Sequence, residues 1–250
     1  MNIMKVAVET GTTGLWYGRF IDLIGTHARA QTLEQLLDEL KEEVIYHNTW
    51  LKRHSEPTIK ISGLKIEVAE LVRDVELLGE SGGSVACFKY DLKPVDEQII
   101  EKCLCYMDFN RQDLLELIKG ISEEKLNYTP NGKKRNIIQI LNHICNAEEW
   151  YISRLGSETD IIYEQNLGIP LDKSDELSVY ERMNIVRKAC KKTLKETLIK
   201  KDGIFMRPEY TQYPNEQWAA RKVLRRFLEH EREHIYNIRW YLGMNIRAFP

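Results

Sequence analysis

Hydrophobic and polar positions alternate at the start of the chain, which is the pattern of a β-strand with one buried face. The alternation runs over residues 3–9 and returns over residues 15–20, with a Gly-Thr-Thr-Gly turn sequence between the two runs. This spacing predicts a β-hairpin. Residues 58–70 and 84–92 have a similar strand-like composition, and turn residues separate them. The first part of the chain is therefore expected to contain a small sheet.

A helical pattern interrupts these strands. Over residues 32–50, apolar side chains recur at every third or fourth position, which predicts an amphipathic helix. Thr32 stands at the expected N-cap, and Gln35 occupies the position that completes a capping box. One helix beside a small sheet indicates an α+β arrangement.

From residue 95 onwards the pattern is helical. The predicted helices cover residues 95–118, 136–155, 178–199 and 215–242. Four helices of this length predict an antiparallel four-helix bundle. The predicted fold class is therefore α+β, with a small α+β domain over residues 1–95 and a four-helix domain over residues 96–250.

Composition and charge narrow the choice of partners. Lys and Arg number 36 against 38 Asp and Glu, so the formal net charge is -2 and no broad attraction to nucleic acid or to an anionic membrane is expected. Apolar runs stay well short of the roughly 18 to 20 residues that span a bilayer. The first residues lack the pattern of a secretory signal, and the five cysteines are a scattered, odd-numbered set typical of reduced thiols. We predict a cytoplasmic protein with no membrane partner, and nucleic acid is disfavoured.

Three histidines lie on faces that are expected to point into the bundle. His230 and His234 are four residues apart, so they share one face of the last predicted helix, and Phe227 and Tyr241 continue that face. His143 lies in a similar apolar stripe on the second predicted helix. Buried imidazoles need polar partners, and a divalent metal bound by neutral rings meets that need. The alternative is that each ring is an ordinary core or surface histidine.

Residues 230–234 read His-Glu-Arg-Glu-His, which matches the zinc-protease motif. A zincin takes its third ligand downstream, yet no His, Asp or Glu follows His234. A protease is therefore disfavoured, and His143 is the expected third ligand. Glu231 lies about 60° around the helix from His234, so we predict it as the catalytic base or as a partner of a ligand. The alternative is a solvated carboxylate beside Arg232.

Basic residues gather on the last two predicted helices. At helical spacing they are expected to form solvated faces, although an anionic cosubstrate or a nucleic-acid backbone is the alternative partner. These residues are Arg187, Lys188, Lys191, Lys192, Lys195, Arg221, Lys222, Arg225 and Arg226.

The helical part resembles the DinB-like (YfiT-like) superfamily. The resemblance covers about residues 105–243 and includes the motif Trp-x-x-Arg-Lys-Val-Leu-Arg-Arg, which begins at Trp218 and precedes the His-x-x-x-His pair. It implies that His143, His230 and His234 bind a divalent ion such as zinc or nickel. Family members often dimerise, and their activities include thiol-dependent transfers and amide-type hydrolyses, so the resemblance implies a small-molecule substrate, a thiol among the options, and a homodimer as one expected assembly.

Residues 3–50 resemble a HicB-like antitoxin domain, through a strand, a glycine turn, an aromatic strand and a helix that starts with Thr-Leu-x-x-Leu-Leu. Three functions stay open on these grounds. The first is a metal-dependent hydrolase or thiol transferase. The second is a metal-binding protein without catalysis, in a stress response or as an interaction module. The third is an antitoxin-like regulator.

Overall fold

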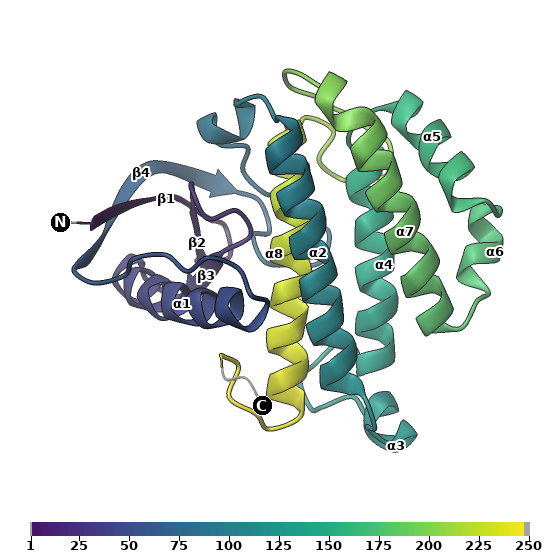
Figure 1. The fold of residues 1–250 in the computed structure, drawn as a ribbon, viewed down its shortest axis with the longest axis horizontal. Helices are drawn as coiled ribbons and strands as arrows, with labels where there is room; N and C mark the ends of the chain where they lie inside the picture. The colour runs from purple at the N-terminus through teal and green to yellow at the C-terminus, as the bar shows by residue number, and fades with distance from the viewer. Residues whose placement is uncertain (1, 248–250) are drawn as a thin grey trace. The chain divides into compact units, whose positions relative to one another are not determined.

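The computed structural model describes residues 2–247 of the chain (Figure 1). They form two compact units. The first unit contains residues 2–93, residues 206–217 and Arg247, and the second contains residues 94–205 and 218–246. The chain therefore leaves the second unit and re-enters it before its last helix.

The first unit is built on a four-stranded sheet. Its strands are β1 (Asn2–Gly11), β2 (Trp16–Phe20), β3 (His27–Ala30) and β4 (Leu64–Val75), in the order β3-β2-β1-β4. The predicted hairpin is confirmed, because β2 runs antiparallel to β1 with Val6 opposite Phe20 and Thr10 opposite Trp16. Strand β4 pairs with β1 in parallel, as a strand that returns after a helix does.

Helix α1 (Leu33–Arg53) packs its apolar stripe on this sheet. Its buried Leu36, Leu40 and Val44 share one core cluster with sheet residues that include Val6 and Phe20. The predicted N-cap is also confirmed, since the Thr32 hydroxyl accepts a hydrogen bond from the Gln35 amide at 3.2 Å. The helical spacing read from the sequence thus identifies the face that forms this core.

Predicted and observed strands of the first unit differ in three places. The strand expected over residues 58–70 is β4, which begins later, at Leu64, and ends at Val75. Residues 84–92 contain the short 3₁₀ helix η1 (Lys89–Leu92) instead of a strand. Backbone amides of this segment donate to side chains and not to a neighbouring strand. The Ala86 amide donates to the Glu9 carboxylate at 2.6 Å, and the Phe88 amide donates to the Asp91 carboxylate at 2.9 Å. Strand β3 was not predicted, since four residues are too few to show an alternating pattern.

Two later segments complete the first unit. The Glu216 carboxylate accepts a hydrogen bond from the Val85 amide at 3.0 Å. Arg247 pairs with Glu39 at 2.6 Å and with Glu43 at 3.2 Å, both on α1. Residues that are far apart in the sequence therefore belong to one compact unit.

The second unit contains four long helices, as predicted. They are α2 (Glu97–Ile118), α4 (Ile137–Ser153), α7 (Val179–Thr197) and α8 (Ala220–Tyr241). Shorter helices occupy the connections, namely α3 (Glu123–Asn127), α5 (Ser157–Leu167), α6 (Leu171–Asp175) and η2 (Leu198–Lys200). The last long helix begins at Ala220 and not at residue 215, because the backbones of Phe205 and Trp218 first pair with each other at 2.7 and 2.8 Å.

The bundle is not antiparallel throughout, so that part of the fold prediction is wrong. Arg221 donates to the Pro94 carbonyl near the starts of α8 and α2, and Arg111 pairs with Glu231 further along both helices. Helices α2 and α8 therefore run in parallel, as Figure 1 also shows.

Helices α4 and α7 form the second parallel pair. Arg182 donates to Asn142, and the later Arg187 donates to the later Glu148. Helices α5 and α6 connect α4 to α7 and return the chain to the starting end, which a parallel pair requires. A prediction that considers only the four long helices does not include this long connection.

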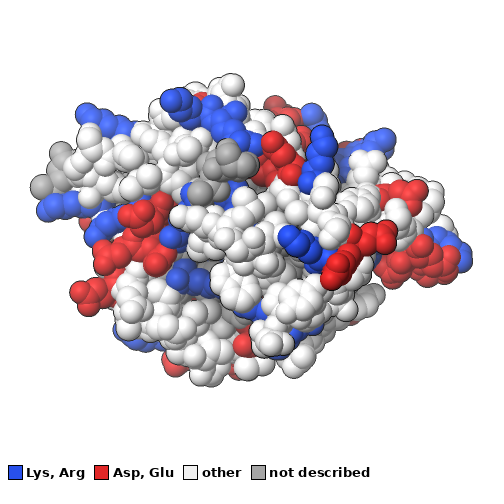
Figure 2. Space-filling view, turned by 90° about the horizontal axis from the view of Figure 1, so that it is seen from below, with Lys and Arg blue, Asp and Glu red and all other residues white. Residues whose placement is uncertain are grey.

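No helix within residues 2–247 has the length and apolar character that a membrane span needs. Basic and acidic side chains are intermixed on the face seen in Figure 2, with broad uncharged areas between them. This distribution agrees with the small formal net charge of -2.

Candidate metal centre

Local sequence fixes where the histidine of α4 lies. Asn136 caps the helix, since its side-chain oxygen accepts from the Gln139 amide at 2.8 Å while its own amide donates to the Gln139 side chain at 2.9 Å. This reciprocal capping box sets the first turn of α4. His143 follows about two turns later, on the stripe that also carries the buried Ile140.

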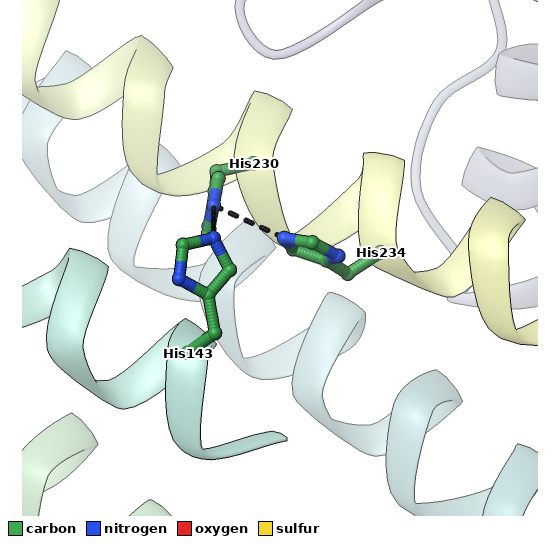
Figure 3. A group of neighbouring side chains, drawn as sticks. All are labelled: His143, His230 and His234. Atoms are coloured by element: carbon green, nitrogen blue, oxygen red, sulfur yellow. Dashed lines mark hydrogen bonds between the residues drawn. The ribbon is translucent and has the colours of Figure 1, made fainter. Parts of the chain in front are cut away.

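The three predicted histidines come together between α4 and α8. The Nε2 atoms of His143 and His230 are 3.2 Å apart, and those of His230 and His234 are 3.1 Å apart (Figure 3). One candidate ligand atom of each ring lies within 4.8 Å of those of the other two. The rings meet edge-on, with interplanar angles of 67°, 90° and 82°. They therefore converge instead of stacking.

This geometry fits one divalent ion. A metal about 2.0 to 2.1 Å from each imidazole nitrogen places two such nitrogens about 3.0 to 3.4 Å apart. The two separations of 3.1 and 3.2 Å lie in that range. Three neutral nitrogen donors also suit zinc and other late divalent metals better than calcium or magnesium.

The electrostatics keep two of the rings neutral. The pKa of His143 is lowered to about 4, chiefly because the ring is withdrawn from water and next because of the charge of Arg135, whereas Glu233 acts in the opposite direction. The pKa of His230 lies well below its ordinary value because of burial and the neighbouring His234 and His143. Neutral imidazole is the form that binds a metal, so both rings are ready for one at neutral pH.

An aromatic wall lies beside His230. The Tyr151 ring meets the His230 ring edge-on at 5.9 Å, and the Phe227 ring meets Tyr151 at 5.5 Å. The Tyr151 hydroxyl accepts a hydrogen bond from Arg226 at 3.2 Å. His143, by contrast, is only half-buried. The site is therefore apolar on the Tyr151 side and reaches solvent on the His143 side.

Glu231 does not lie in solvent beside Arg232, so that alternative for the residue is wrong. Its side chain is 1% exposed, and its two oxygens accept from Arg111 at 2.7 Å and from Arg187 at 2.8 Å. Burial acts to raise the pKa of this carboxyl, but the two guanidinium groups outweigh it and lower the pKa. A role for Glu231 as a base stays a prediction, and these ion pairs oppose it because they make the carboxylate bind a proton less readily.

Several basic residues predicted to form solvated faces are buried. Arg187 contacts Glu148 and Glu231 in the bundle interior, and Lys222 is 0% exposed, with its ammonium 4.0 Å from the centre of the Trp218 ring. The sequence does contain a sign that Arg187 is buried. Met183 and Cys190 are apolar residues at helical spacing on either side of it, and both are buried. The others of this set that are buried are Arg225 and Arg226.

A helical bundle that brings three imidazoles to one point is a metal-binding architecture. The family model described as the DinB superfamily matches residues 106–238, which is more than half of the chain. The chain therefore belongs to the DinB superfamily. No curated protein and no solved structure matches it. The HicB-like resemblance of residues 3–50 lies outside the matched range and stays a prediction.

Proposed function

We propose that this protein is a divalent-metal-dependent enzyme, a hydrolase or a thiol transferase, that acts on a small molecule. His143, His230 and His234 hold the ion, and zinc or nickel is the expected metal because both accept imidazole donors. The convergence of the three Nε2 atoms carries the proposal.

The number of ligands favours catalysis over a structural metal site. Structural zinc sites are closed by four protein ligands, whereas catalytic sites use three and leave a position open. Within the part of the chain that the structure describes, the group of mutually close ligand atoms contains these three histidines. A fourth position would therefore be available to a substrate or a water molecule.

The histidines and the aromatic rings beside them would contribute to catalysis in different ways. The neutral imidazoles leave the full charge of the ion in place, and the Tyr151 and Phe227 rings exclude water from one side. A divalent ion held there supplies Lewis-acid chemistry, which polarises a carbonyl group or lowers the pKa of a water or thiol. The half-buried side of His143 is the expected approach for the substrate.

Metal analysis of purified protein tests the site. After treatment with a chelator and reloading with zinc or nickel, we expect about one ion per wild-type chain. His143→Ala is expected to retain less than about a tenth of that content, since two imidazoles bind a divalent ion far more weakly than three. His54→Ala is the matched control because His54 lies on the first unit. The proposal is wrong if the wild type takes up no stoichiometric metal, or if His143→Ala takes up as much.

Cobalt substitution separates an enzyme site from a closed metal site. A cobalt ion with an open position changes its visible spectrum when a small thiol such as 2-mercaptoethanol is added, because a ligand enters the coordination sphere. We expect this change with the wild type. A spectrum that stays constant as the thiol is added would favour a metal-binding protein without catalysis.

A further inference from the structure

The interior of the bundle contains four charged residues, one from each long helix. They are Arg111 on α2, Glu148 on α4, Arg187 on α7 and Glu231 on α8, and all four are buried. We call them the Arg–Glu network. Two positive and two negative charges face each other there, so the set is neutral as a whole although each member is costly to bury alone.

Arg111 contacts all three of the other helices. Its guanidinium donates to Glu231 at 2.7 Å, to Glu148 at 2.8 Å and to the Met183 carbonyl of α7 at 2.6 Å. A guanidinium is planar and its donors have fixed directions. These three acceptors therefore have to occupy defined positions around it.

Arg187 repeats this arrangement from the opposite helix. It donates to Glu148 at 3.1 Å, to Glu231 at 2.8 Å and to the Met107 carbonyl of α2 at 2.5 Å. The two carboxylates are thus each shared by two arginines. Rotation of α4 or α8 about its axis would break bonds to both arginines at once.

The same two helices carry the histidines. Glu231 follows His230 directly and lies about 60° around α8 from His234. Glu148 is five residues beyond His143 on α4, about 7.5 Å along the axis. A nitrogen about 6 Å from a helix axis moves by roughly 1 Å when the helix turns by 10°, which exceeds the roughly 0.5 Å that a metal site tolerates.

We propose that the Arg–Glu network positions the metal ligands: it fixes the rotation of α4 and α8 so that His143, His230 and His234 converge before any ion binds. This inference rests on the proposed metal site. It assigns the four residues to positioning, since their bonds are to one another and to main-chain carbonyls.

A second ion pair, between a buried arginine and a partly buried glutamate, provides the comparison. Glu149 is the neighbour of Glu148 on α4, and it pairs with Arg182 of α7 at 2.9 Å and accepts from Tyr163 at 2.9 Å. These contacts of Glu149 are to α5 and α7 and not to the helix of the His-x-x-x-His pair. Loss of Glu149 therefore tests stability without touching the position of α8.

The experiment measures zinc affinity by chelator competition, the cobalt spectrum and the thermal midpoint for the wild type, Glu231→Gln, Arg187→Lys and Glu149→Gln. Arg187→Lys keeps every charge, so the fold is retained, but one ammonium cannot bond in the three fixed directions of the fork. We expect Glu231→Gln and Arg187→Lys to bind zinc at least tenfold more weakly with an altered cobalt spectrum. Glu149→Gln is expected to stay within about threefold of the wild type.

Two results would overturn the inference. One is wild-type affinity and an unchanged cobalt spectrum in Arg187→Lys. The other is an affinity loss in Glu149→Gln equal to that in Glu231→Gln at a similar loss of thermal stability, which would make the network a general stabiliser only. If the wild type itself binds no metal, the proposed function fails first, so the two failures are distinguishable.

Discussion

His230 and Glu231 are neighbours on α8, yet their side chains belong to two different polar groups. The His230 imidazole meets His143 and His234, whereas the Glu231 carboxylate lies between Arg111 and Arg187. Consecutive helical residues leave the axis about 100° apart, so one helix can serve both groups. A single turn of α8 therefore links the candidate metal site to the charged interior of the bundle.

Metal removal is expected to lower the stability of the helical unit. A ligand that binds only the folded state stabilises it, by about 2.7 kcal/mol when its free concentration is a hundred times its dissociation constant. Added zinc should therefore raise the thermal midpoint of the wild type and leave that of His143→Ala nearly unchanged. Calorimetry with and without zinc checks this, and an equal rise in both proteins would contradict it.

Acid is expected to destabilise the metal-free protein through His143. Its folded pKa of about 4 is below the ordinary value of 6.5, so the unfolded state binds more protons between these two pH values. The contribution of the neutral ring is complete above pH 6.5 and is lost as the pH falls towards 4, by on the order of 2 kcal/mol.

Urea unfolding at pH 7.5 and pH 4.5 measures this effect. The metal-free wild type should lose more stability between the two conditions than His143→Ala does, because the variant has no imidazole to protonate at this position. If acidification lowers the free energy of unfolding of the wild type no more than that of His143→Ala, His143 is excluded as the cause.

Tyr151 is expected to matter more for its ring than for its hydroxyl. Tyr151→Phe removes the hydrogen bond from Arg226 and should cost about 1 kcal/mol, while the contact of the ring with His230 remains. Tyr151→Ala also removes a buried aromatic ring and should cost about 3 to 5 kcal/mol. Urea unfolding ranks the two variants, and equal costs would show that the ring contact adds nothing.

The Glu9–Arg19 pair of the first unit should be far more sensitive than a surface pair of the same length. Its atoms are 2.6 Å apart and buried, and Glu9 also accepts from the Ala86 amide. Glu9→Gln leaves the Arg19 charge uncompensated and should cost about 3 to 5 kcal/mol.

Lys41 and Asp38 provide the matched control for this prediction, since they are 2.7 Å apart with both side chains exposed. Asp38→Asn should change the free energy of unfolding by less than about 1 kcal/mol. Chemical denaturation followed by fluorescence compares the two variants. The reasoning from burial fails if both variants unfold at the same denaturant concentration.

The histidines were predictable because their signal is local. His230 and His234 repeat at helical spacing on an apolar stripe, and that spacing alone places both rings on one face. His143 was chosen as the third ligand because it faces inward on its own helix and because no further donor follows His234, and the family resemblance then supported that choice.

The Arg–Glu network was not predicted because a charged residue in a helical sequence normally lies on a solvated face. The charges of its members compensate each other across four helices. The sequence does not show such pairing, because it depends on how the helices pack. The parallel pairs were missed for a related reason, since α5 and α6 decide the direction of α7 although they add little to the hydrophobic pattern.

The return of residues 206–217 and Arg247 to the first unit has a consequence for synthesis of the protein. The sheet of that unit is made early, with its last strand ending at Val75. The partner that Val85 needs, Glu216, and the arginine that pairs with Glu39 and Glu43 leave the ribosome only after most of the helices. The first unit is therefore completed only after most of the second has been translated, and neither unit can be excised or transplanted as one uninterrupted stretch of chain.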